Sequence, residues 1–278
     1  MDIFKYKKDI RKNIESLKTW ATIGFVPTMG ALHKGHLSLI DCSIKQNDVT
    51  VVSIFVNPTQ FNDKNDFKNY PKTPDADLKI LEDTKCDIVF IPSENEMYDT
   101  PDTRKFHFGK LDKVMEGKYR PGHFNGVAKI VTKLFDLINP HRAYFGLKDY
   151  QQVVIIKKLT EDLKFPVKII GCPIVRENDG LAMSSRNSLL SAEERKSAAL
   201  IYLALCQAKQ NSRKYSISNI KKQVINILNE NPYIRVEYFE IVNGDNLEPV
   251  QSWDEPSVKV GCIAAKVGNV RLIDNIQF

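Results

Sequence analysis

Two histidines three residues apart are the first candidates for chemistry. His33 and His36 lie in 27-PTMGALHKGH-36, between a β-branched apolar segment and a helical pattern. Both can face one side of a helix start, where imidazoles can donate to phosphate oxygens and stabilise a pentacovalent phosphorus. A helix start also offers free N–H groups to an anion, and Met29 and Gly30 allow a ligand to approach the backbone. The pair could also be ordinary loop residues or metal ligands, but its place at a strand–helix junction favours the phosphate role.

Two neutral amides follow the next apolar segment. Asn57 and Gln60 occur in 57-NPTQF-61, directly after a stretch rich in β-branched residues. Amides both donate and accept, so they suit a substrate that carries hydroxyls and a carboxylate. The alternative is an Asn-Pro turn with a polar surface.

A turn before a predicted helix carries an arginine. Arg120 opens the segment 120-RPGHFNGV-127, in which Pro-Gly makes a turn. The guanidinium could pair with an anionic substrate, or it could be incidental to the turn.

A lysine and an aspartate follow another predicted strand, in 146-GLKDYQQ-152. Lys148 offers a mobile point charge for phosphates. Asp149 can accept from a ribose hydroxyl or orient the lysine, and Gln152 lies on the first turn of the following helix. Read alone, a Lys-Asp pair in a loop is usually surface.

Two hydroxyls stand beside an arginine in 183-MSSRN-187. Ser184, Ser185 and Arg186 can wrap the β- and γ-phosphates of a nucleotide. The segment could instead be a phosphorylatable surface loop or the cap of the next helix. Its occurrence together with the paired histidines favours the phosphate role.

These candidates need a framework, and the apolar periodicity predicts an alternation of strands and helices. Such alternation is typical of a Rossmann-like, doubly wound parallel sheet, in which ligands bind beyond the carboxyl ends of the strands. We expect the segment 27–30 to break the first strand. The predicted strands are 22–26, 49–56, 87–91, 142–146 and 167–175, and the predicted helices are 7–19, 35–46, 75–85, 125–138 and 149–163.

The last hundred residues follow another pattern. Two helices, over 191–210 and 217–230, precede three short strands over 234–242, 258–266 and 270–276. We therefore expect a catalytic domain over 1–175 and a smaller α+β lid domain over 176–278.

Composition narrows the class of protein. The net charge of +6 suits small anionic substrates, and no run of five or six basic residues indicates a nucleic-acid footprint. The five cysteines are odd in number and include no CxxC pair, which argues against a disulfide framework or a cysteine-based zinc site. The chain also lacks an 18-residue apolar run and a signal-like start, so we expect no membrane partner and a cytoplasmic location.

The five motifs together resemble a known family. PTMGALHKGH resembles the HxGH signature of the nucleotidylyltransferase superfamily, and the longer string resembles the pantothenate synthetases (pantoate–β-alanine ligases) in particular. NPTQF, RPGHFNGV, GLKDYQQ and GLAMSSRN resemble the family's remaining segments, in the same order over about 160 of the 278 residues. The last of them is similar to the KMSKS loop of class I aminoacyl-tRNA synthetases.

The resemblance implies a reaction. ATP would activate pantoate as an acyl-adenylate, and β-alanine would then displace AMP to give pantothenate, with pyrophosphate released in the first step. It implies pantoate or β-alanine contacts for Gln60, Gln152, Asn57 and Arg120. It implies catalytic roles for His36, His33, Lys148, Ser184, Ser185 and Arg186. The implied ATP-binding residues are Met29, Gly30, Ala31, Leu32, His33, Lys34, Gly35, His36, Gly146, Lys148, Asp149, Val175, Met183, Ser184, Ser185 and Arg186.

Two positions depart from the family pattern. Leu147 stands where the family has a glutamate, and Ala76 stands where an acid is common, between Asp75 and Asp77. ATP requires Mg²⁺, which phosphates, waters and one or two acids usually hold. Because of Ala76, the sequence identifies no metal ligand.

Two other functions fit parts of the sequence. Another nucleotidylyltransferase would share the histidine and serine motifs, but NPTQF and KDYQQ favour pantoate over a phosphorylated acceptor. A non-catalytic nucleotide- or RNA-binding module would explain Leu147 and Ala76. The family resemblance further implies a homodimer.

Overall fold

A six-stranded parallel sheet forms the larger part of the molecule. The computed structural model describes all residues 1–278. The spatial order is β1-β4-β3-β2-β5-β6. The strands are β1 (Asp2–Phe4), β2 (Ile23–Thr28), β3 (Val49–Ile54), β4 (Ile88–Phe90), β5 (Arg142–Gly146) and β6 (Lys168–Cys172).

Helices cover both faces of this sheet, because alternate strand residues point to opposite sides. On β2, Phe25 packs with α1 (Lys7–Leu17), α7 (His123–Ile138) and α8 (Tyr150–Asp162) in the largest apolar cluster. Its neighbour Val26 packs on the other face with α2 (Lys34–Ile44) and α4 (Pro74–Glu82). The predicted doubly wound fold is confirmed.

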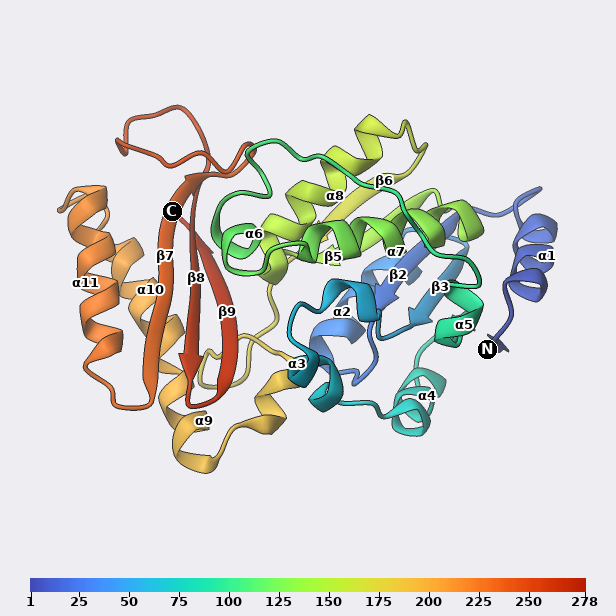
Figure 1. Ribbon diagram of the computed structural model, residues 1–278, viewed down its shortest axis with the longest axis horizontal. Helices are drawn as coiled ribbons and strands as arrows, with labels where there is room; N and C mark the ends of the chain where they lie inside the picture. The colour runs from blue at the N-terminus through green and yellow to red at the C-terminus, as the bar shows by residue number, and fades with distance from the viewer.

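The C-terminal part is a second, antiparallel sheet with its own core. The strands β7 (Ile234–Asn243), β8 (Lys259–Val267) and β9 (Val270–Gln277) lie in sequence order. Helices α9 (Ala192–Ala198), α10 (Leu200–Asn211) and α11 (Ile217–Asn229) lie beside this sheet, at the end of the molecule away from the N-terminus (Figure 1). The predicted smaller α+β part is confirmed, while the boundary between 175 and 176 remains a proposal.

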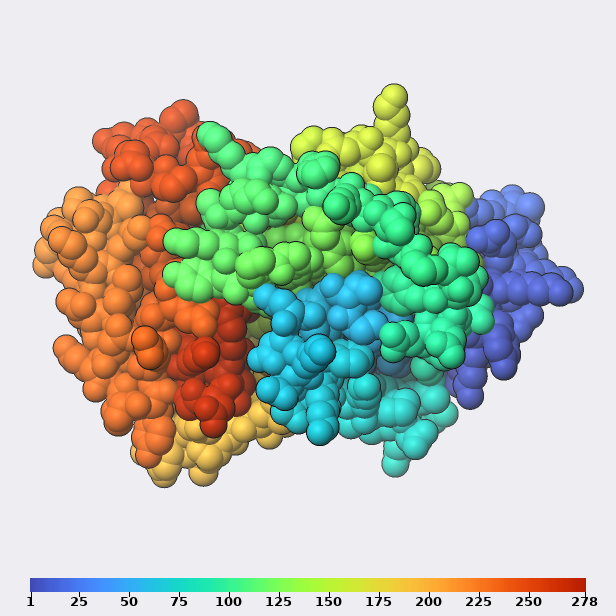
Figure 2. Space-filling model, in the orientation of Figure 1, coloured from blue at the N-terminus to red at the C-terminus, as the bar shows by residue number.

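The two sheets are joined by apolar contacts. Met115 and Val154 from the first part pack with Tyr238, Val242 and Cys262 of the antiparallel sheet. Figure 2 shows, on one face, the segments that contain α3 (Lys64–Asn69), α6 (Met115–Tyr119) and β9 meeting. The C-terminal part therefore packs against the first part near the carboxyl ends of the central strands.

No helix combines the length and the apolar character needed to cross a bilayer.

Three local expectations were wrong. The strand that was expected to break at Pro27 continues to Thr28. Its pairing with β3 extends to Thr28, whereas its pairing with β5 ends at Phe25. Because β5 no longer pairs at Pro27, the missing N–H of proline costs no hydrogen bond to that strand. The helix expected over 191–210 is divided at Ala199. The short elements β1, α3, α5 (Glu94–Met97) and α6 were missed, as were the 3₁₀ helices η1 (Pro58–Gln60), η2 (Leu147–Asp149) and η3 (Ser185–Leu189).

Candidate active site

A cavity of about 230 Å³ lies at the carboxyl ends of β2, β3, β5 and β6. The chain runs outward from β2 to β3 and β4, then crosses to β5 and β6 on the other side. This reversal leaves a crevice, which is where doubly wound sheets bind ligands. Every predicted site residue lines the cavity except Gly30, Ala31, Leu32 and Lys34.

The two histidines at the start of α2 are held by backbone groups. Nδ1 of His33 accepts from the Gly35 N–H at 3.1 Å, and Nδ1 of His36 accepts from the His33 N–H at 3.3 Å. In a neutral imidazole that accepts at Nδ1, the proton is on Nε2. Both rings line the cavity, with centroids 4.0 Å apart. The helix start therefore offers two Nε2–H donors.

Electrostatics keep both rings neutral. Burial, and then the Lys148 ammonium, lower the pKa of His33 to about 4. Burial, and then His33 and Lys148, lower the pKa of His36 to about 3. At neutral pH these side chains carry no charge, and their Nε2–H groups can donate hydrogen bonds to a ligand.

A buried carboxylate shapes the loop before the histidines. Asp77, which is 1% exposed, accepts from the backbone N–H of Ala31 at 2.9 Å and of Leu32 at 2.7 Å. These bonds hold Ala31 at a φ of 50°, a left-handed conformation that is costly for a residue with a side chain. They also turn the loop backbone toward α4, which is why Gly30, Ala31 and Leu32 lie outside the cavity lining.

Asn57 holds Gln60 in place. The Asn57 amide donates to Gln60 Oε1 at 3.2 Å and to the Gly126 carbonyl at 3.0 Å, and its oxygen accepts from Tyr98 Oη at 2.6 Å. Gly126 permits this packing, since a Cβ there would lie 2.1 Å from the Thr59 carbonyl oxygen. Asn57 is thus occupied by protein contacts, while Gln60 turns its Nε2 toward Met29 at the cavity.

The 3₁₀ helix η2 brings Lys148 and Asp149 to the cavity. The ammonium and the carboxylate are 3.5 Å apart. Gln152 lines the cavity one turn later, whereas Gln151 is buried and donates to the carbonyls of Leu111 and Val114. Leu147, the first residue of η2, is outside the lining and packs over Gly171. Its side chain offers the cavity no polar group.

The serine–arginine loop closes one side of the cavity. Ser184 Oγ accepts from the Arg186 N–H, and Ser185 Oγ donates to the Ala31 carbonyl at 3.2 Å. The Arg186 guanidinium forms a forked ion pair with Asp66 of α3 and lies over the Tyr70 ring. Arg186 uses Nε and Nη2 on Asp66, which leaves Nη1 as a donor for a ligand.

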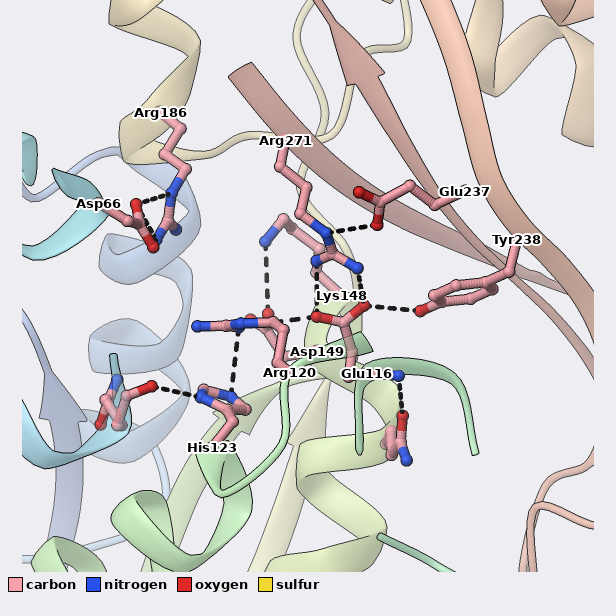
Figure 3. Close-up of polar contacts among 12 residues, drawn as sticks. Asp66, Glu116, Arg120, His123, Lys148, Asp149, Arg186, Glu237, Tyr238 and Arg271 are labelled. Carbon is pink, nitrogen blue, oxygen red and sulfur yellow. Dashed lines mark hydrogen bonds and ion pairs between the residues drawn. The ribbon is translucent and has the colours of Figure 1, made fainter. Parts of the chain in front are cut away.

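A polar network on the other side centres on Glu116 (Figure 3). Glu116 of α6 accepts two bonds of 2.7 Å from Arg271 of β9 and one of 2.8 Å from Tyr238 of β7. Burial alone would raise the pKa of the Glu116 carboxyl, but Arg271 outweighs it and lowers the pKa to about 2. Glu116 is thus an anion held jointly by both parts of the molecule.

Arg120 lies between this network and the cavity. Its guanidinium is 3.6 Å from Glu116 and 3.4 Å from Nε2 of His123 (Figure 3). His123 Nδ1 lies 2.8 Å from the Gln60 carbonyl, so that nitrogen carries the proton and Nε2 accepts from Arg120. Burial, and then Arg120, lower the pKa of His123 to about 4. Arg120 keeps donors free for a ligand.

Sequence reasoning missed His123 and the apolar wall. His123 is part of RPGHF, but a histidine within a turn motif gave no chemical signal of its own. The wall comes mainly from one face of α7, whose 3.6-residue periodicity indicates burial equally well against a core or a ligand. Its members are Leu39, Phe55, Val127, Ile130, Val131 and Leu134.

The charges around the cavity favour an anion. Arg120, Lys148 and Arg186 are its cationic lining residues, and Asp149 is the single acidic one. No group of three or more His, Cys, Asp or Glu side chains is arranged to hold a metal ion. Asp75 is exposed and Asp77 is occupied by backbone donors, so neither flank of Ala76 offers a preformed metal ligand.

Fold and site together define an α/β protein with an enzyme-like crevice at the carboxyl ends of a parallel sheet. The crevice suits a multiply charged anion that lies beside an apolar group. Comparison with known proteins specifies the family. The family model described as pantoate-beta-alanine ligase matches residues 2–277. The chain belongs to the pantoate–β-alanine ligase family of enzymes.

Individual relatives agree along the whole chain. A pantothenate synthetase of Bacteroides fragilis is 51% identical over 279 residues, covering 100% of this chain and 99% of the relative. The crystal structure of pantothenate synthetase from Thermus thermophilus matches with a TM-score of 0.93 at 39% identity, covering 99% of each chain. The pantoate-beta-alanine ligase of Francisella tularensis, complexed with beta-gamma ATP and beta-alanine, matches with a TM-score of 0.85 at 37% identity, covering 99% of this chain and 97% of that one. These matches favour neither another nucleotidylyltransferase nor a non-catalytic module.

Proposed function

We propose that the enzyme condenses pantoate with β-alanine through a pantoyl-adenylate, releasing pyrophosphate and AMP. The strongest support is the pair of neutral histidines, which offer two Nε2–H donors beside three cations in one cavity. Such an array stabilises negative charge that develops on a phosphate. The complex of the Francisella tularensis relative with beta-gamma ATP and beta-alanine supports ATP and β-alanine as ligands.

ATP would bind across the start of α2. We assign the α-phosphate to His33 and His36, and the β- and γ-phosphates to Lys148, Ser184, Ser185 and Arg186. Asp149 suits a ribose hydroxyl, and Val175 and Met183 suit the adenine, since all three line the same cavity. Gly35 and Gly146 allow the nucleotide to approach the backbone.

Pantoate would bind in the deeper part of the cavity. Pantoate carries a carboxylate and a hydroxyl on one side of a dimethyl carbon and a second hydroxyl on the other side. The amides of Gln60 and Gln152 suit its polar groups, and the apolar wall from α7 suits its methyl groups. Asn57 acts through Gln60, whose amide it orients.

The chemistry needs no protein nucleophile. The pantoate carboxylate attacks the α-phosphorus, the bond to the β-phosphate breaks, and pyrophosphate leaves. The amine of β-alanine then attacks the acyl carbon, loses a proton, and AMP departs. Alignment of the reactants contributes roughly 7–11 kcal/mol in favourable cases. Arg120 suits a substrate carboxylate, because its guanidinium is only loosely paired.

Mg²⁺ would enter with the triphosphate. The cavity has one carboxylate, Asp149, and no prebuilt cluster of acidic ligands. This donor set fits an ion that would be held largely by phosphates and waters. When bound, Mg²⁺ neutralises charge on the leaving pyrophosphate.

The C-terminal part would shelter the reactive anhydride from water. We propose that residues 176–278 form this lid domain on a catalytic domain of residues 1–175. Excluding water prevents hydrolysis of the adenylate. We further propose a homodimer in the cytoplasm, a compartment that suits the five free cysteines. Sedimentation velocity of the purified protein tests the dimer.

Pyrophosphate exchange tests the mechanism. Labelled pyrophosphate should enter ATP when pantoate is present, whether or not β-alanine is added. Pantothenate should form only with all three substrates. Exchange that requires β-alanine, or no exchange in a folded protein that binds ATP with Mg²⁺, would rule out an adenylate that forms before β-alanine reacts.

A further inference from the structure

The last strand of the chain reaches back to the turn that carries Lys148. Asn275 of β9 is 6% exposed. Its amide nitrogen donates to the Leu147 carbonyl at 2.8 Å and to the Lys148 carbonyl at 2.9 Å. Both protons of the Asn275 amide are therefore donated to backbone carbonyls of η2. The two acceptors, Leu147 and Lys148, lie 128 and 127 residues earlier in the sequence.

Neighbouring bonds fix Asn275 itself. The Asn275 N–H donates to Asp274 Oδ1 at 2.7 Å, and its backbone carbonyl accepts from Arg176 at 3.3 Å. Asp274 in turn accepts two bonds from Arg176, of 2.7 and 3.0 Å, and the Arg176 guanidinium lies 3.7 Å from the centre of the Tyr202 ring. These bonds hold the backbone of Asn275 in place and so fix the position of its side chain.

Arg176, which bonds Asp274 and Asn275, also anchors the serine–arginine loop. Arg176 begins a hairpin that pairs with Ala182 and leads directly into Ser184–Arg186. Arg176 also donates to the Gly180 carbonyl at 3.0 Å at the tip of this hairpin. Gly180 has a φ of 91° and lies against Tyr202, where a Cβ would come within 2.3 Å of the ring. Two cavity segments therefore meet at one place on β9.

We propose that Asn275 is a positioning residue, which holds the backbone of η2 so that the Lys148 ammonium meets the phosphates of ATP. Neither Asn275 nor Asp274 lines the main cavity, so Asn275 acts through Lys148. The C-terminal part then sets the geometry of the phosphate site as well as covering it. This inference rests on the phosphate role proposed above for Lys148.

An isosteric substitution removes the two donors. Asn275→Asp keeps the shape of the side chain but presents oxygens to two carbonyl oxygens. The matched control is Gln277→Glu, the same amide-to-acid change two residues further along β9 on an exposed side chain. Calorimetric titration with Mg²⁺–ATP should show about tenfold weaker binding for Asn275→Asp, a loss typical of one displaced charge-assisted contact, and no change for Gln277→Glu.

A double-mutant cycle separates positioning from general damage. In a Lys148→Ala background, Asn275→Asp should weaken ATP binding little further, because the group that it positions is absent. If Asn275→Asp is unfolded by circular dichroism, Asn275→Ala replaces it in the same cycle. Unchanged affinity in the single Asn275 variant overturns the inference.

The two levels of the proposal fail differently. Weaker binding in Lys148→Ala, with a fully additive further loss in the double variant, overturns the role of Asn275 alone. Normal ATP affinity in Lys148→Ala overturns the phosphate role of Lys148, and the role of Asn275 with it.

Discussion

At the residue scale, the two histidines of the cavity offer hydrogen-bond donors and no charge. His33 and His36 accept backbone N–H groups at Nδ1 and so keep Nε2–H donors for a ligand. Burial is the main cause of their lowered pKa, which prevents the imidazoles from becoming cations at neutral pH. The positive charge comes instead from Arg120, Lys148 and Arg186.

Removing one of these donors should impair adenylation without unfolding the protein. We expect His36→Ala to lower pantoate-dependent pyrophosphate exchange by roughly 10²–10³-fold, as for other donors to a developing anion. The exposed His107 provides the control, and His107→Ala should exchange at the normal rate. Near-normal turnover in His36→Ala, with an unchanged melting temperature, would contradict the role of His36.

Short connecting elements, more than the long helices, decide where site residues lie. The helix α4 contributes Asp77, which fixes the loop between β2 and α2 although no residue of α4 lines the cavity. The 3₁₀ helices η1, η2 and η3 carry Gln60, Lys148 and Arg186. Each is too short to be stable alone, so its geometry depends on the contacts described above.

Asp77→Asn tests the role of α4. The substitution replaces one acceptor oxygen by a donor that faces a backbone N–H, so we expect a loss of about 1–3 kcal/mol in the free energy of unfolding. Pyrophosphate exchange should fall as well, because the loop before His33 relaxes. Asp75→Asn, on the exposed side of the same helix, should change neither. Equal effects of the two substitutions, or a raised Mg²⁺ requirement in Asp75→Asn, would contradict this division of roles.

At the scale of the whole molecule, the buried Glu116 carboxylate joins the two parts through an ion pair. Arg271 of β9 pairs with Glu116 of α6 and also with Glu237 of β7 (Figure 3). Within the C-terminal part, Arg176 pairs with the buried Asp274. By contrast, Lys110 and Glu248 join the same two parts with side chains that are 84% and 50% exposed.

Glu116→Gln should therefore destabilise the protein much more than Glu248→Gln. Breaking a buried pair leaves Arg271 undercompensated and costs about 3 kcal/mol, whereas an exposed pair contributes less than about 1 kcal/mol. Urea unfolding of the two variants measures the difference. ATP binding by Glu116→Gln should also weaken if Arg120 shifts. Similar midpoints for the two variants would show that the buried network does not bind the parts together.

Three histidines that are neutral at pH 7 predict how stability depends on pH. The pKa values of His33, His36 and His123 fall to about 4, 3 and 4, from an ordinary value of about 6.5. Below about pH 6.5 the unfolded chain binds protons that the native protein refuses, so the free energy of unfolding falls as pH falls toward 4. Each histidine contributes at most about 1.4 kcal/mol per pH unit.

Urea unfolding at pH 7 and at pH 5 measures this loss. A His123→Gln variant should lose less stability over the same interval, because it has one fewer linked proton. Stability that is constant between the two pH values would contradict the neutral state assigned to the three rings.

The amino-acid sequence by itself determined the fold class and the approximate content of the site. Apolar periodicity is a local property, so β3, β5, α8 and the C-terminal strands were predicted to within a few residues. Motifs that follow strands identify site residues for a similar reason, because parallel strands end at one edge. The segments that contain Asn57 and Lys148 could thus be expected at one edge of the sheet before any contact was known.

Only the tertiary structure decided which of these side chains face the cavity and what holds them. Asn57 proved to be occupied by Gln60, Gly126 and Tyr98, and Asp77 by the loop that it shapes. His123, Glu116 and Asn275 gain their importance from partners that lie 63 to 155 residues away in sequence. No local pattern encodes such a partner, because hydrogen-bond geometry and burial arise only when distant segments pack together.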